Sequence, residues 1–370
     1  MRVLYDGIVF QNSYQRGIQR AFRELIDHMP EPPTGPELTL ALADRPKCPL
    51  PARAGVRRTV PGFVGLLGRN MRASLIARLS PRGMKKAAAG CDVFHSTYYT
   101  LPPRDMPTVV HVHDLIPEKF PDLFPADWAR AEIEARRRAI LGATRIITIS
   151  SATADDVIRM FPEMSQKVTT VYFGCEHLQK TQPDRASNSH RTPDGERYAL
   201  YVGERTGYKN FSIIFNAMKK DVWPGDVGLT VAGPPFTDAE QKIANELTPT
   251  LPVRHAGRPN DAELAGLFAN AMCVIVPSLA EGFGFPVLEG QAAGTHVVCS
   301  DIPVFREVAG KGAFFFDPKH PEDLARKVAE AASPLTQQSR EEAVWQNLRR
   351  FSWDRCSREV LSVYESALRA

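Results

Sequence analysis

The chain repeats one pattern over most of its length: a short apolar run rich in β-branched residues, then a turn, then a helical segment. Short unbroken apolar runs are typical of parallel strands that are buried on both faces. Because these runs alternate with helices, the sequence predicts an α/β fold with doubly wound sheets. The strands are expected at 3–5, 38–42, 93–95, 108–112, 145–149, 168–172, 198–202, 228–232, 253–255, 273–276, 296–299 and 313–316.

The pattern stops once and then restarts, which indicates two domains. Residues 178–197 are rich in Ser, Thr, Pro and charged residues and contain almost no core-forming positions. A chain of 370 residues is also long enough for two separate cores. We therefore predict Rossmann-like domains over 1–180 and 198–350, a linker over 181–197, and a last helix over 351–370 that packs back on the first domain. The helices are expected at 16–28, 127–141, 151–160, 211–220, 238–247, 261–269, 287–293, 321–332, 337–350 and 353–369.

Composition and cysteine spacing argue against several classes of protein. No segment reaches the ~18 uninterrupted apolar residues that a membrane-spanning helix needs. The first residues lead into Gln11 and Asn12 without a small-residue cleavage site, so they predict a buried strand and not a signal peptide. The six cysteines lie far apart without a C-x-x-C pair, which suggests neither a zinc site nor a disulfide framework. We expect a cytosolic protein with reduced, buried cysteines.

One segment carries a strong excess of positive charge. The chain has a net charge of +4, yet residues 45–91 alone contain eleven Lys and Arg and no Asp or Glu. Apolar residues are interleaved with these charges, as on surfaces that bind anionic lipid head groups. We predict a membrane- or acceptor-facing patch that includes Arg69, Arg72, Lys85 and Lys86. A basic helix that only packs on its own domain is the plain alternative, and a nucleic-acid site fits less well because the segment has a single aromatic residue.

The most informative motif occupies residues 278–294 and reads SLAEGFGFPVLEGQAAG. It follows an expected strand, so its loop lies at the carboxyl end of that strand, where ligands bind in α/β sheets. Gly282 and Gly284 let backbone N–H groups approach a ligand, and the N-terminus of the following helix favours anions. Glu281 and Glu289 flank the turn, and carboxylates accept strong hydrogen bonds from hydroxyl groups.

A second motif supplies positive charge at the same edge of the second-half sheet. Residues 201–211 read YVGERTGYKNF and place Arg205 and Lys209 in the loop after the first strand of that half. Fixed cations there would offset the charge of a diphosphate, including the charge that develops on a leaving diphosphate. Cations for phosphate beside carboxylates for hydroxyls predict a nucleotide-sugar as the ligand. Exposed surface charges are the plain alternative for each of these residues taken alone.

Together these motifs resemble the retaining glycosyltransferases of family 4. That family has the GT-B fold, in which two Rossmann-like domains face a central cleft. The resemblance covers roughly residues 198–318, including GTHVVCSDIPVFREVAG, and extends more weakly to HVHDLIP and VTTVYFGCE in the first half. It implies that the second domain binds the nucleotide-sugar and that the first domain binds the acceptor.

The resemblance also implies a role for each matching residue of the second half. Arg205 and Lys209 would grip the donor diphosphate, and Glu281 would hold hydroxyls of the donor sugar. Glu289 would bind the ribose hydroxyls, and the turn between the glutamates would offer backbone donors. The turn residues are Gly282, Phe283 and Gly284, and the nucleobase is expected near Val253, Arg254, His255 and Arg258.

In the first half, the resemblance assigns His113 to the sugar and the reaction centre. It assigns the loop at 12–21, with Gly17 and Arg16, to the donor diphosphate, although this loop has one glycine where the family has a pair. His111 and His113 fall on one face of a strand, so both also fit histidines of the core or its rim. A metal site on His-x-His-Asp would need further ligands that the sequence does not show. No cofactor and no catalytic metal are expected.

The predicted reaction is the transfer of a hexose from a nucleotide-sugar to an acceptor hydroxyl, with retention of the anomeric configuration. No nucleophile is evident opposite the donor, so a front-side displacement is expected, in which the departing diphosphate takes the acceptor proton. The stretch VHVHDLIPEKFPDLFP resembles bacterial mannosyltransferases of O-antigen and exopolysaccharide assembly. It favours GDP-mannose over UDP-glucose, UDP-N-acetylhexosamine and dTDP-rhamnose.

The acceptor is expected to be a glycan, either lipopolysaccharide or a sugar linked to polyprenyl diphosphate. The protein would then be cytoplasmic or peripheral at the anionic inner leaflet of the cytoplasmic membrane, and nucleic acid is not an expected partner. A sugar phosphorylase or a nucleotide-sugar epimerase of the same fold is one alternative. A non-catalytic sugar-nucleotide-binding subunit of a polysaccharide assembly complex is another, and the joint presence of Arg205, Lys209 and Glu281 argues against it.

Overall fold

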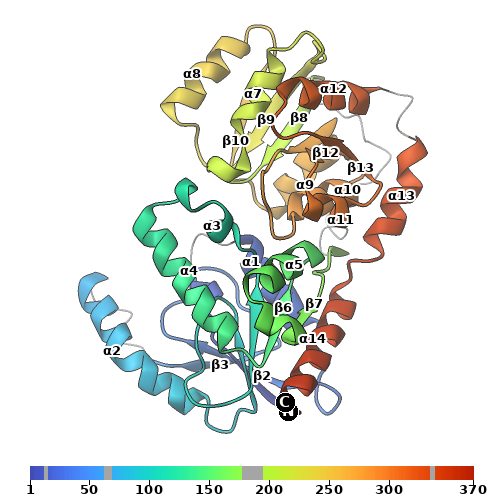
Figure 1. Ribbon diagram of the computed structural model, residues 1–370. Helices are drawn as coiled ribbons and strands as arrows, with labels where there is room; N and C mark the ends of the chain where they lie inside the picture. Colours follow the sequence, from blue (N-terminus) through green and yellow to red (C-terminus); the bar gives the residue numbers. More distant parts are fainter. Residues whose placement is uncertain (12–15, 62–68, 177–194, 334–337) are drawn as a thin grey trace. The chain divides into compact units, whose positions relative to one another are not determined.

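The computed structural model describes residues 1–11, 16–61, 69–176, 195–333 and 338–370, and the chain divides into two compact units. The first unit comprises Met1–Gly174 and Ser352–Ala370, and the second comprises Cys175–Phe351. Each unit is built on one sheet, so the predicted class of two doubly wound α/β domains is confirmed (Figure 1). Most of the predicted linker at 181–197 lies outside the described residues.

The first unit is built on a seven-stranded sheet in the order β3-β2-β1-β4-β5-β6-β7, and all of its strand pairs are parallel. The edge strand β3 was not predicted, because all four of its residues are exposed and it lacks the apolar run that marks the other strands. The strands are β1 (Arg2–Tyr5), β2 (Glu37–Leu42), β3 (Gly55–Arg58), β4 (Val93–Ser96), β5 (Thr108–Val112), β6 (Arg145–Thr148) and β7 (Val168–Thr170).

The C-terminal helix of the chain belongs to the core of the first unit. It contacts the first α-helix and strands β4, β5 and β6, and it buries Trp353 and Tyr364 completely. The α-helices of this unit are α1 (Arg16–Asp27), α2 (Arg69–Ala87), α3 (Ile116–Lys119), α4 (Ala126–Leu141), α5 (Ser151–Met160) and α14 (Trp353–Leu368). Its short 3-10 helices are η1 (Ile8–Gln11), η3 (Pro121–Leu123) and η4 (Pro162–Lys167).

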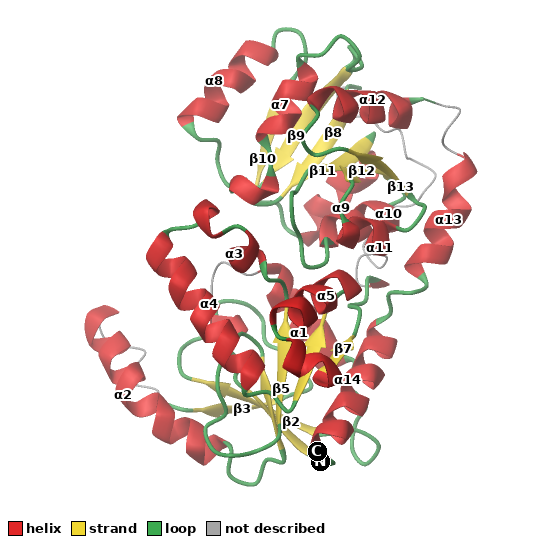
Figure 2. Ribbon diagram, viewed as in Figure 1, coloured by secondary structure: helices red, strands yellow, loops and turns green. Residues whose placement is uncertain are grey.

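The second unit is built on a six-stranded parallel sheet in the order β10-β9-β8-β11-β12-β13, and helices cover both of its faces (Figure 2). Its strands are β8 (Arg197–Val202), β9 (Val227–Ala232), β10 (Val253–Gly257), β11 (Cys273–Val276), β12 (His296–Ser300) and β13 (Ala313–Phe316). Its helices are η6 (Gly207–Lys209), α7 (Ser212–Met218), α8 (Asp238–Leu247), α9 (Asp261–Asn270), α10 (Phe285–Ala292), α11 (Pro303–Ala309), α12 (Pro321–Ala332) and α13 (Gln338–Leu348).

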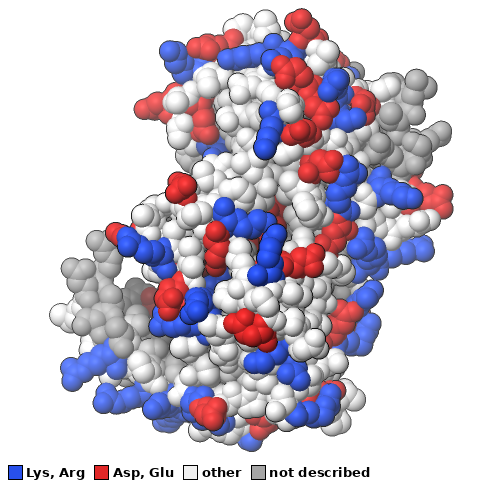
Figure 3. Space-filling model, in the orientation of Figure 1, with Lys and Arg blue, Asp and Glu red and all other residues white. Residues whose placement is uncertain are grey.

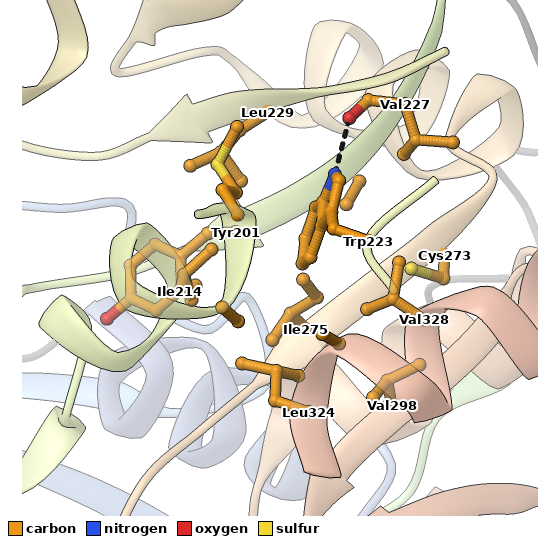
Figure 4. Close-up of a cluster of buried hydrophobic side chains, with 14 of the residues drawn as sticks. Tyr201, Ile214, Trp223, Val227, Leu229, Cys273, Ile275, Val298, Leu324 and Val328 are labelled. Atoms are coloured by element: carbon orange, nitrogen blue, oxygen red, sulfur yellow. Dashed lines mark hydrogen bonds between the residues drawn. The ribbon is translucent and has the colours of Figure 1, made fainter. Parts of the chain in front are cut away.

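A dense apolar core fixes the sheet of the second unit. Ile275 of β11 and Leu324 of α12 pack in it beside Trp223, and all three side chains are buried (Figure 4). The indole N–H of Trp223 donates to the carbonyl oxygen of Val227 over 2.8 Å, so this large side chain is buried without an unpaired donor. The core therefore gives the loops at the strand ends a rigid base.

The strand order changes direction next to the first strand in both sheets. This switch point lies between β1 and β4 in the first unit and between β8 and β11 in the second. Doubly wound sheets bind ligands at the carboxyl ends of the strands that flank such a point. The loops after these four strands are therefore the places to look for a site.

The chain passes between the two units at two neighbouring positions. The backbone N–H of Cys175 donates to the carbonyl oxygen of Phe351 over 3.2 Å. The buried thiol of Cys175 donates to the same oxygen over 3.5 Å. On the first-unit side, the rings of Phe173 and Trp353 pack with centroids 5.7 Å apart. The second unit is thus an insertion into the first, and its two ends are hydrogen-bonded to each other.

Candidate active site

The two loops at the switch point of the second unit are tied together. One follows β8 and contains η6, and the other follows β11 and leads into α10. The backbone N–H of Leu279 in the second loop donates to the carbonyl oxygen of Tyr208 in the first over 2.8 Å. Gly284, the N-cap of α10, has a φ of 96°, and a Cβ there would lie 2.6 Å from the ring of Phe305. Only glycine fits this position, so the turn before α10 requires it.

These loops bring together two of the predicted residues, Lys209 and Glu281. The ammonium Nζ of Lys209 donates to Oε1 of Glu281 over 2.6 Å. The hydroxyl of Ser278 donates to the same oxygen over 2.8 Å. Among the described residues, the other N–H groups of Lys209 and Oε2 of Glu281 have no hydrogen-bond partner. The pair can therefore both donate to a ligand and accept from one.

The charge of Lys209 is set by its surroundings. Burial is the largest single influence and lowers the pKa of Lys209, but the carboxylate of Glu281 together with Tyr208 and Tyr201 outweighs it, so the pKa lies above its ordinary value. Lys209 is therefore protonated at neutral pH. The side chains of Lys209 and Glu281 are 23% and 13% exposed, so a ligand can reach them from solvent. A phosphate oxygen would find a fixed cation here, and a hydroxyl would find a fixed carboxylate.

Arg205 lies in the loop after β8 but contacts a different part of the second unit. Its guanidinium forms two hydrogen bonds with Glu240, at 2.9 and 3.2 Å. It also donates to the carbonyl oxygens of Pro234, over 2.8 Å, and Pro235, over 2.6 Å. The side chain is only 5% exposed and packs over the ring of Phe236. Arg205 thus holds the loop after β9, and its predicted contact with a diphosphate stays a prediction.

Glu240 is a good partner for Arg205 because other donors also hold its carboxylate. It closes the capping box of α8, in which Thr237 donates to it through both its backbone N–H and its hydroxyl. Burial raises the pKa of Glu240, but the bonds from Arg205 and Thr237 outweigh burial, and the pKa lies below its ordinary value. Glu240 is therefore ionised at neutral pH.

The turn between the two predicted glutamates is anchored by Phe283. Its buried ring packs edge-on against Phe285, with centroids 5.3 Å apart, and against Phe351, with centroids 5.8 Å apart. Glu289 lies in the second turn of α10 and is only 8% exposed. The aromatic packing holds the backbone of the turn in place, while its predicted bonds to a donor and the predicted ribose contact of Glu289 stay predictions.

The region predicted for the nucleobase forms the edge strand β10 and the residue after it. The Nε2 of His255 donates to the carbonyl oxygen of Pro234 over 2.8 Å, so His255 supports the loop that Arg205 holds. Arg258 lies 3.7 Å from Glu204 in the loop after β8. Arg254 points elsewhere and pairs with a glutamate just before β8. His255 and Arg258 are thus next to the loops of the site, and Arg254 is not.

In the first unit, His113 lies directly after β5 with a buried ring. Its Nε2 donates to the carbonyl oxygen of Thr97 over 3.1 Å, and its backbone N–H donates to the hydroxyl of Tyr99 over 3.2 Å. Because a carbonyl oxygen only accepts, Nε2 carries the proton and Nδ1 of the neutral ring is an acceptor. This Nδ1 is buried without a hydrogen-bond partner among the described residues. Gly17 is exposed in the first turn of α1, and the side chain of Arg16 lies outside the described residues.

His111 belongs to a group of buried rings that are linked by hydrogen bonds. Its Nδ1 lies 2.8 Å from Nε2 of His95, whose Nδ1 lies 2.6 Å from the hydroxyl of Tyr364. The hydroxyl of Tyr364 in turn meets that of Tyr5 over 2.6 Å. The rings of His95, His111 and His113 are stacked, with centroid distances of 5.0 and 5.9 Å. His111 thus lies in the core, and its Nε2, like Nδ1 of His113, is buried without a hydrogen-bond partner among the described residues.

Burial controls the charge of these rings. It lowers the pKa of His95 to about 3, with His113 as a second, smaller cause. It lowers the pKa of His111 well below the ordinary value and also lowers that of His113. All three rings are therefore neutral at neutral pH. In the described ranges, no three His, Cys, Asp or Glu side chains form a group that could hold a metal ion.

The predicted basic patch lies on α2 of the first unit. Lys85 and Lys86 are exposed near its C-terminal end, whereas the side chains of Arg69 and Arg72 lie outside the described residues. Figure 3, drawn in the orientation of Figure 1, shows Lys and Arg side chains gathered at the edge where α2 lies. Of the helices in the described part of the chain, none has the length and hydropathy to cross a bilayer.

Three residues that support these sites were not predicted from the sequence. Ser278 stands three residues before Glu281 in the same loop, and that spacing was the available signal. Glu240 belongs to a Thr-x-x-Glu sequence that predicts a capping box, but the pattern does not reveal the bond to Arg205. Thr97 acts through its backbone carbonyl, which any residue would provide, so no sequence signal marks it.

Comparison with known proteins identifies the family of the chain. Residues 183–343 match the family model of Glycosyl transferases group 1, and residues 15–177 match that of Glycosyltransferase Family 4. The O-antigen chain mannosyltransferase B of Escherichia coli is 23% identical over 289 residues, which are 74% of each chain. The O-antigen chain mannosyltransferase RfbU of Salmonella typhimurium is 27% identical over 227 residues, which are 60% of each chain.

A solved structure shows the same fold. The Anabaena protein Alr3699/HepE in complex with UDP-glucose matches with a TM-score of 0.72 at 17% identity, over 99% of this chain and 100% of that one. The two family matches span most of the chain, one in each half. The chain therefore belongs to the glycosyltransferases of group 1 and family 4, and it has the GT-B fold.

Proposed function

We propose that this glycosyltransferase moves a hexose from a nucleotide-sugar to a hydroxyl of a glycan or lipid-linked acceptor in bacterial surface polysaccharide assembly. The reaction retains the anomeric configuration and uses no metal. The Lys209–Glu281 pair at the switch point of the second unit is the main support. A diphosphate that is joined to a polyol needs a fixed cation beside a fixed carboxylate, and this pair offers both.

Each member of the pair has unused hydrogen-bonding capacity for one part of the donor. Lys209 gives one N–H group to Glu281, so its other N–H groups serve the diphosphate oxygens. Glu281 uses Oε1 for Lys209 and Ser278, so Oε2 serves a sugar hydroxyl. Arg205 must exchange a bond to Glu240 or to a carbonyl oxygen before it can reach a phosphate. We therefore assign the first contact with the diphosphate to Lys209.

The proposed chemistry is a front-side displacement. The bond between the anomeric carbon and the diphosphate breaks, and its electron pair leaves with the diphosphate. The acceptor oxygen forms the new bond on the same face, and its proton passes to the departing diphosphate. Lys209 stabilises the charge that grows on the leaving group. His113, with a proton on Nε2, offers Nδ1 as an acceptor for a sugar hydroxyl.

GDP-mannose is the donor that we favour. Its support is the resemblance of the segment at 110–125 and the similarity to two O-antigen chain mannosyltransferases. The test is a panel of GDP-mannose, UDP-glucose, UDP-N-acetylglucosamine and dTDP-rhamnose, in which a bound donor raises the midpoint of thermal unfolding by mass action. GDP-mannose should give the largest increase in the wild type and none in Lys209→Met.

Lys220→Met is the matched control for that panel, because Lys220 pairs with Glu322 in the same unit away from the switch point. It should respond to GDP-mannose as the wild type does. Transfer to an acceptor should then continue in EDTA and yield the α-configured product, read by NMR. Absence of stabilisation by every donor, or turnover that requires free phosphate, would reject the proposal.

The acceptor is proposed to lie at the inner leaflet of the cytoplasmic membrane, with the basic patch on α2 as the contact. Each basic residue near an anionic surface contributes ~1 kcal/mol to binding. Lys85→Glu with Lys86→Glu should weaken co-sedimentation with phosphatidylglycerol vesicles. The exposed pair Lys242 and Lys311 of the second unit, changed in the same way, is the control. Equal effects of both pairs would remove the membrane contact from the proposal.

A further inference from the structure

A turn at the switch point of the first unit holds His113 from two sides. The turn begins at the last residue of β4 and spans Ser96–Thr100. Its Thr97 carbonyl oxygen accepts from the His113 ring, and its Tyr99 hydroxyl accepts from the His113 backbone. Tyr99 has a φ of 55°, in the left-handed region that side chains other than glycine rarely adopt. Such a conformation persists only where the surroundings enforce it, so something must hold this turn.

The carboxylate of Asp6, at the carboxyl end of β1, holds the turn. It is 5% exposed and accepts from the backbone N–H groups of Thr97, over 3.0 Å, and Ile8, over 3.2 Å. The hydroxyls of Thr97 and Thr100 also donate to it, and the hydroxyl of Ser96 lies 3.5 Å away. Two carboxylate oxygens offer about four acceptor positions, and these donors fill them. Asp6 therefore has no capacity left for a ligand.

The path from Asp6 to His113 consists of two steps. Asp6 fixes Thr97 through both its N–H and its hydroxyl, and the Thr97 carbonyl oxygen then fixes the ring of His113. Because that oxygen must accept, the proton stays on Nε2 and Nδ1 stays an acceptor. A turn that moved away would free the ring to rotate and to place its proton on either nitrogen.

We propose that Asp6 is a positioning residue that sets the orientation and the tautomer of His113 through Thr97. Its importance for transfer rests on the proposed function, in which Nδ1 of His113 accepts from a sugar hydroxyl. The proposal assigns Asp6 no contact with either substrate. It therefore predicts a loss in turnover without a matching loss in donor binding.

The test combines Asp6→Asn with the pair Thr97→Val and Thr97→Ser in the full-length protein. Histidine labelled with 15N in the ring reports the tautomer by NMR, and His113→Gln identifies the His113 signal. Wild type and Thr97→Ser should show the proton on Nε2, whereas Asp6→Asn and Thr97→Val should show both tautomers. The same two variants should lose about tenfold or more in kcat, since misplacing a group that orients the sugar is costly, with the donor KM within about twofold.

Thr148→Val is the control for the loss of a buried hydroxyl. Thr148 is buried in the same unit, and its hydroxyl bonds to that of Thr170 over 3.2 Å. Among the described residues, this hydroxyl has no hydrogen bond to the Ser96–Thr100 turn. It should lower the thermal midpoint but leave the His113 signal and kcat unchanged. An unchanged His113 signal in Asp6→Asn, or a kcat loss no larger than that of Thr148→Val, would overturn the proposal. If Asp6→Asn does not fold, the comparison of Thr97→Val with Thr97→Ser, in the His113 tautomer and in kcat, tests the proposal instead.

These outcomes separate the inference from the proposed function. If the wild type transfers sugar from no donor, the proposed function fails, while the NMR comparison still decides whether Asp6 controls the His113 ring. If the tautomer changes but kcat does not, His113 has no role in turnover and Asp6 is not a positioning residue for the reaction.

Discussion

The two switch points use the same chemical group for different purposes. Asp6 of the first unit is 5% exposed, and neutral donors occupy all of its acceptor positions. Glu281 of the second unit is 13% exposed, accepts from one cation and one hydroxyl, and keeps Oε2 without a partner among the described residues. Each carboxylate links, by hydrogen bonds, the loops that follow two neighbouring strands. The number of donors, more than burial, separates a structural carboxylate from one that is available to a ligand.

The two switch points also differ in the titratable groups that lie near them. The first unit keeps the rings of His95, His111 and His113 neutral by burial. The second unit pairs its charged groups, Arg205 with Glu240 and Lys209 with Glu281. The stability of a unit that buries neutral histidine rings falls at low pH, because the unfolded chain binds protons there. The stability that an ion pair provides is lost when one of its two partners is removed. Four experiments test this contrast.

The largest effect is expected from acid, and it should fall on the first unit. The ordinary histidine pKa is 6.5, and burial lowers that of His95 to about 3. Between these values the unfolded chain binds a proton that the folded unit rejects, so the free energy of unfolding falls as the pH falls. Each such group lowers the free energy of unfolding by up to about 1.4 kcal/mol per pH unit, and the three rings together by up to about 4 kcal/mol per pH unit.

Hydrogen exchange in increasing urea at pH 7, 6 and 5, resolved by peptide, measures this effect. Peptides of the first unit should lose protection before those of the second. His111→Gln should reduce the slope with pH, whereas His320→Gln, an exposed position in the second unit, controls for the removal of a histidine. If the two units lose the same protection as the pH falls, the buried histidines do not distinguish the first unit from the second.

The next largest effect should follow from breaking the Lys209–Glu281 pair. Lys209→Met and Glu281→Gln should each lower kcat about 10²–10³-fold, the range found when a group that stabilises developing charge is removed. Because the two side chains act as one unit, the double variant should lose about as much as either single variant. Steady-state transfer kinetics measure this. Near-normal turnover in either single variant would remove the pair from the active site.

A smaller effect is expected when Glu240 is removed. Glu240→Ala leaves the nearly buried guanidinium of Arg205 without its carboxylate and should cost about 2–3 kcal/mol of unfolding free energy in the second unit. Glu263→Ala is the matched control, because Glu263 closes the capping box of α9 without an arginine partner. That variant should cost about 0.5–1 kcal/mol. Equal costs in urea denaturation would show that the bond to Arg205 adds no stability.

The smallest effect is expected from Ser278→Ala. The hydroxyl of Ser278 donates to the oxygen of Glu281 that also binds Lys209, so its loss loosens Glu281 without removing the ion pair. A hydrogen bond from a hydroxyl to a carboxylate contributes about 1.5 kcal/mol at the lower end of its range, so kcat should fall about tenfold. Ser278→Thr should keep most of the activity. A loss as large as that of Glu281→Gln would make Ser278 a direct substrate contact.

The fold could be predicted from the sequence because each buried strand is a short apolar run between turns. Strand β3 was not predicted, because it is an exposed edge strand with two arginines and has no apolar run. In the second unit, Lys209 and Glu281 could be placed together because both follow strands that meet at one sheet edge. The bond from Arg205 to Glu240 could not be predicted, since Glu240 lies on a helix whose distance from that loop depends on packing.

The first unit was harder to predict because its polar contacts run through the backbone and across distant segments. Asp6 and Thr97 are 91 positions apart, and the bond to His113 uses a carbonyl oxygen that every residue has. The ring network around His95 depends on Tyr364, which reaches it from the last helix of the chain. Position in the sequence gives no sign of such contacts until the sheet order is known.

The insertion of the second unit makes it a transplantable module. Its first and last residues, Cys175 and Phe351, are already within hydrogen-bonding distance, so a short peptide could join Gly174 to Ser352 in its absence. A single recombination cassette bounded by these two positions would carry β8 to α13 intact. Exchange of that cassette among relatives would replace the part with the Lys209–Glu281 pair and retain the part with His113, which gives chimeras a natural pair of breakpoints.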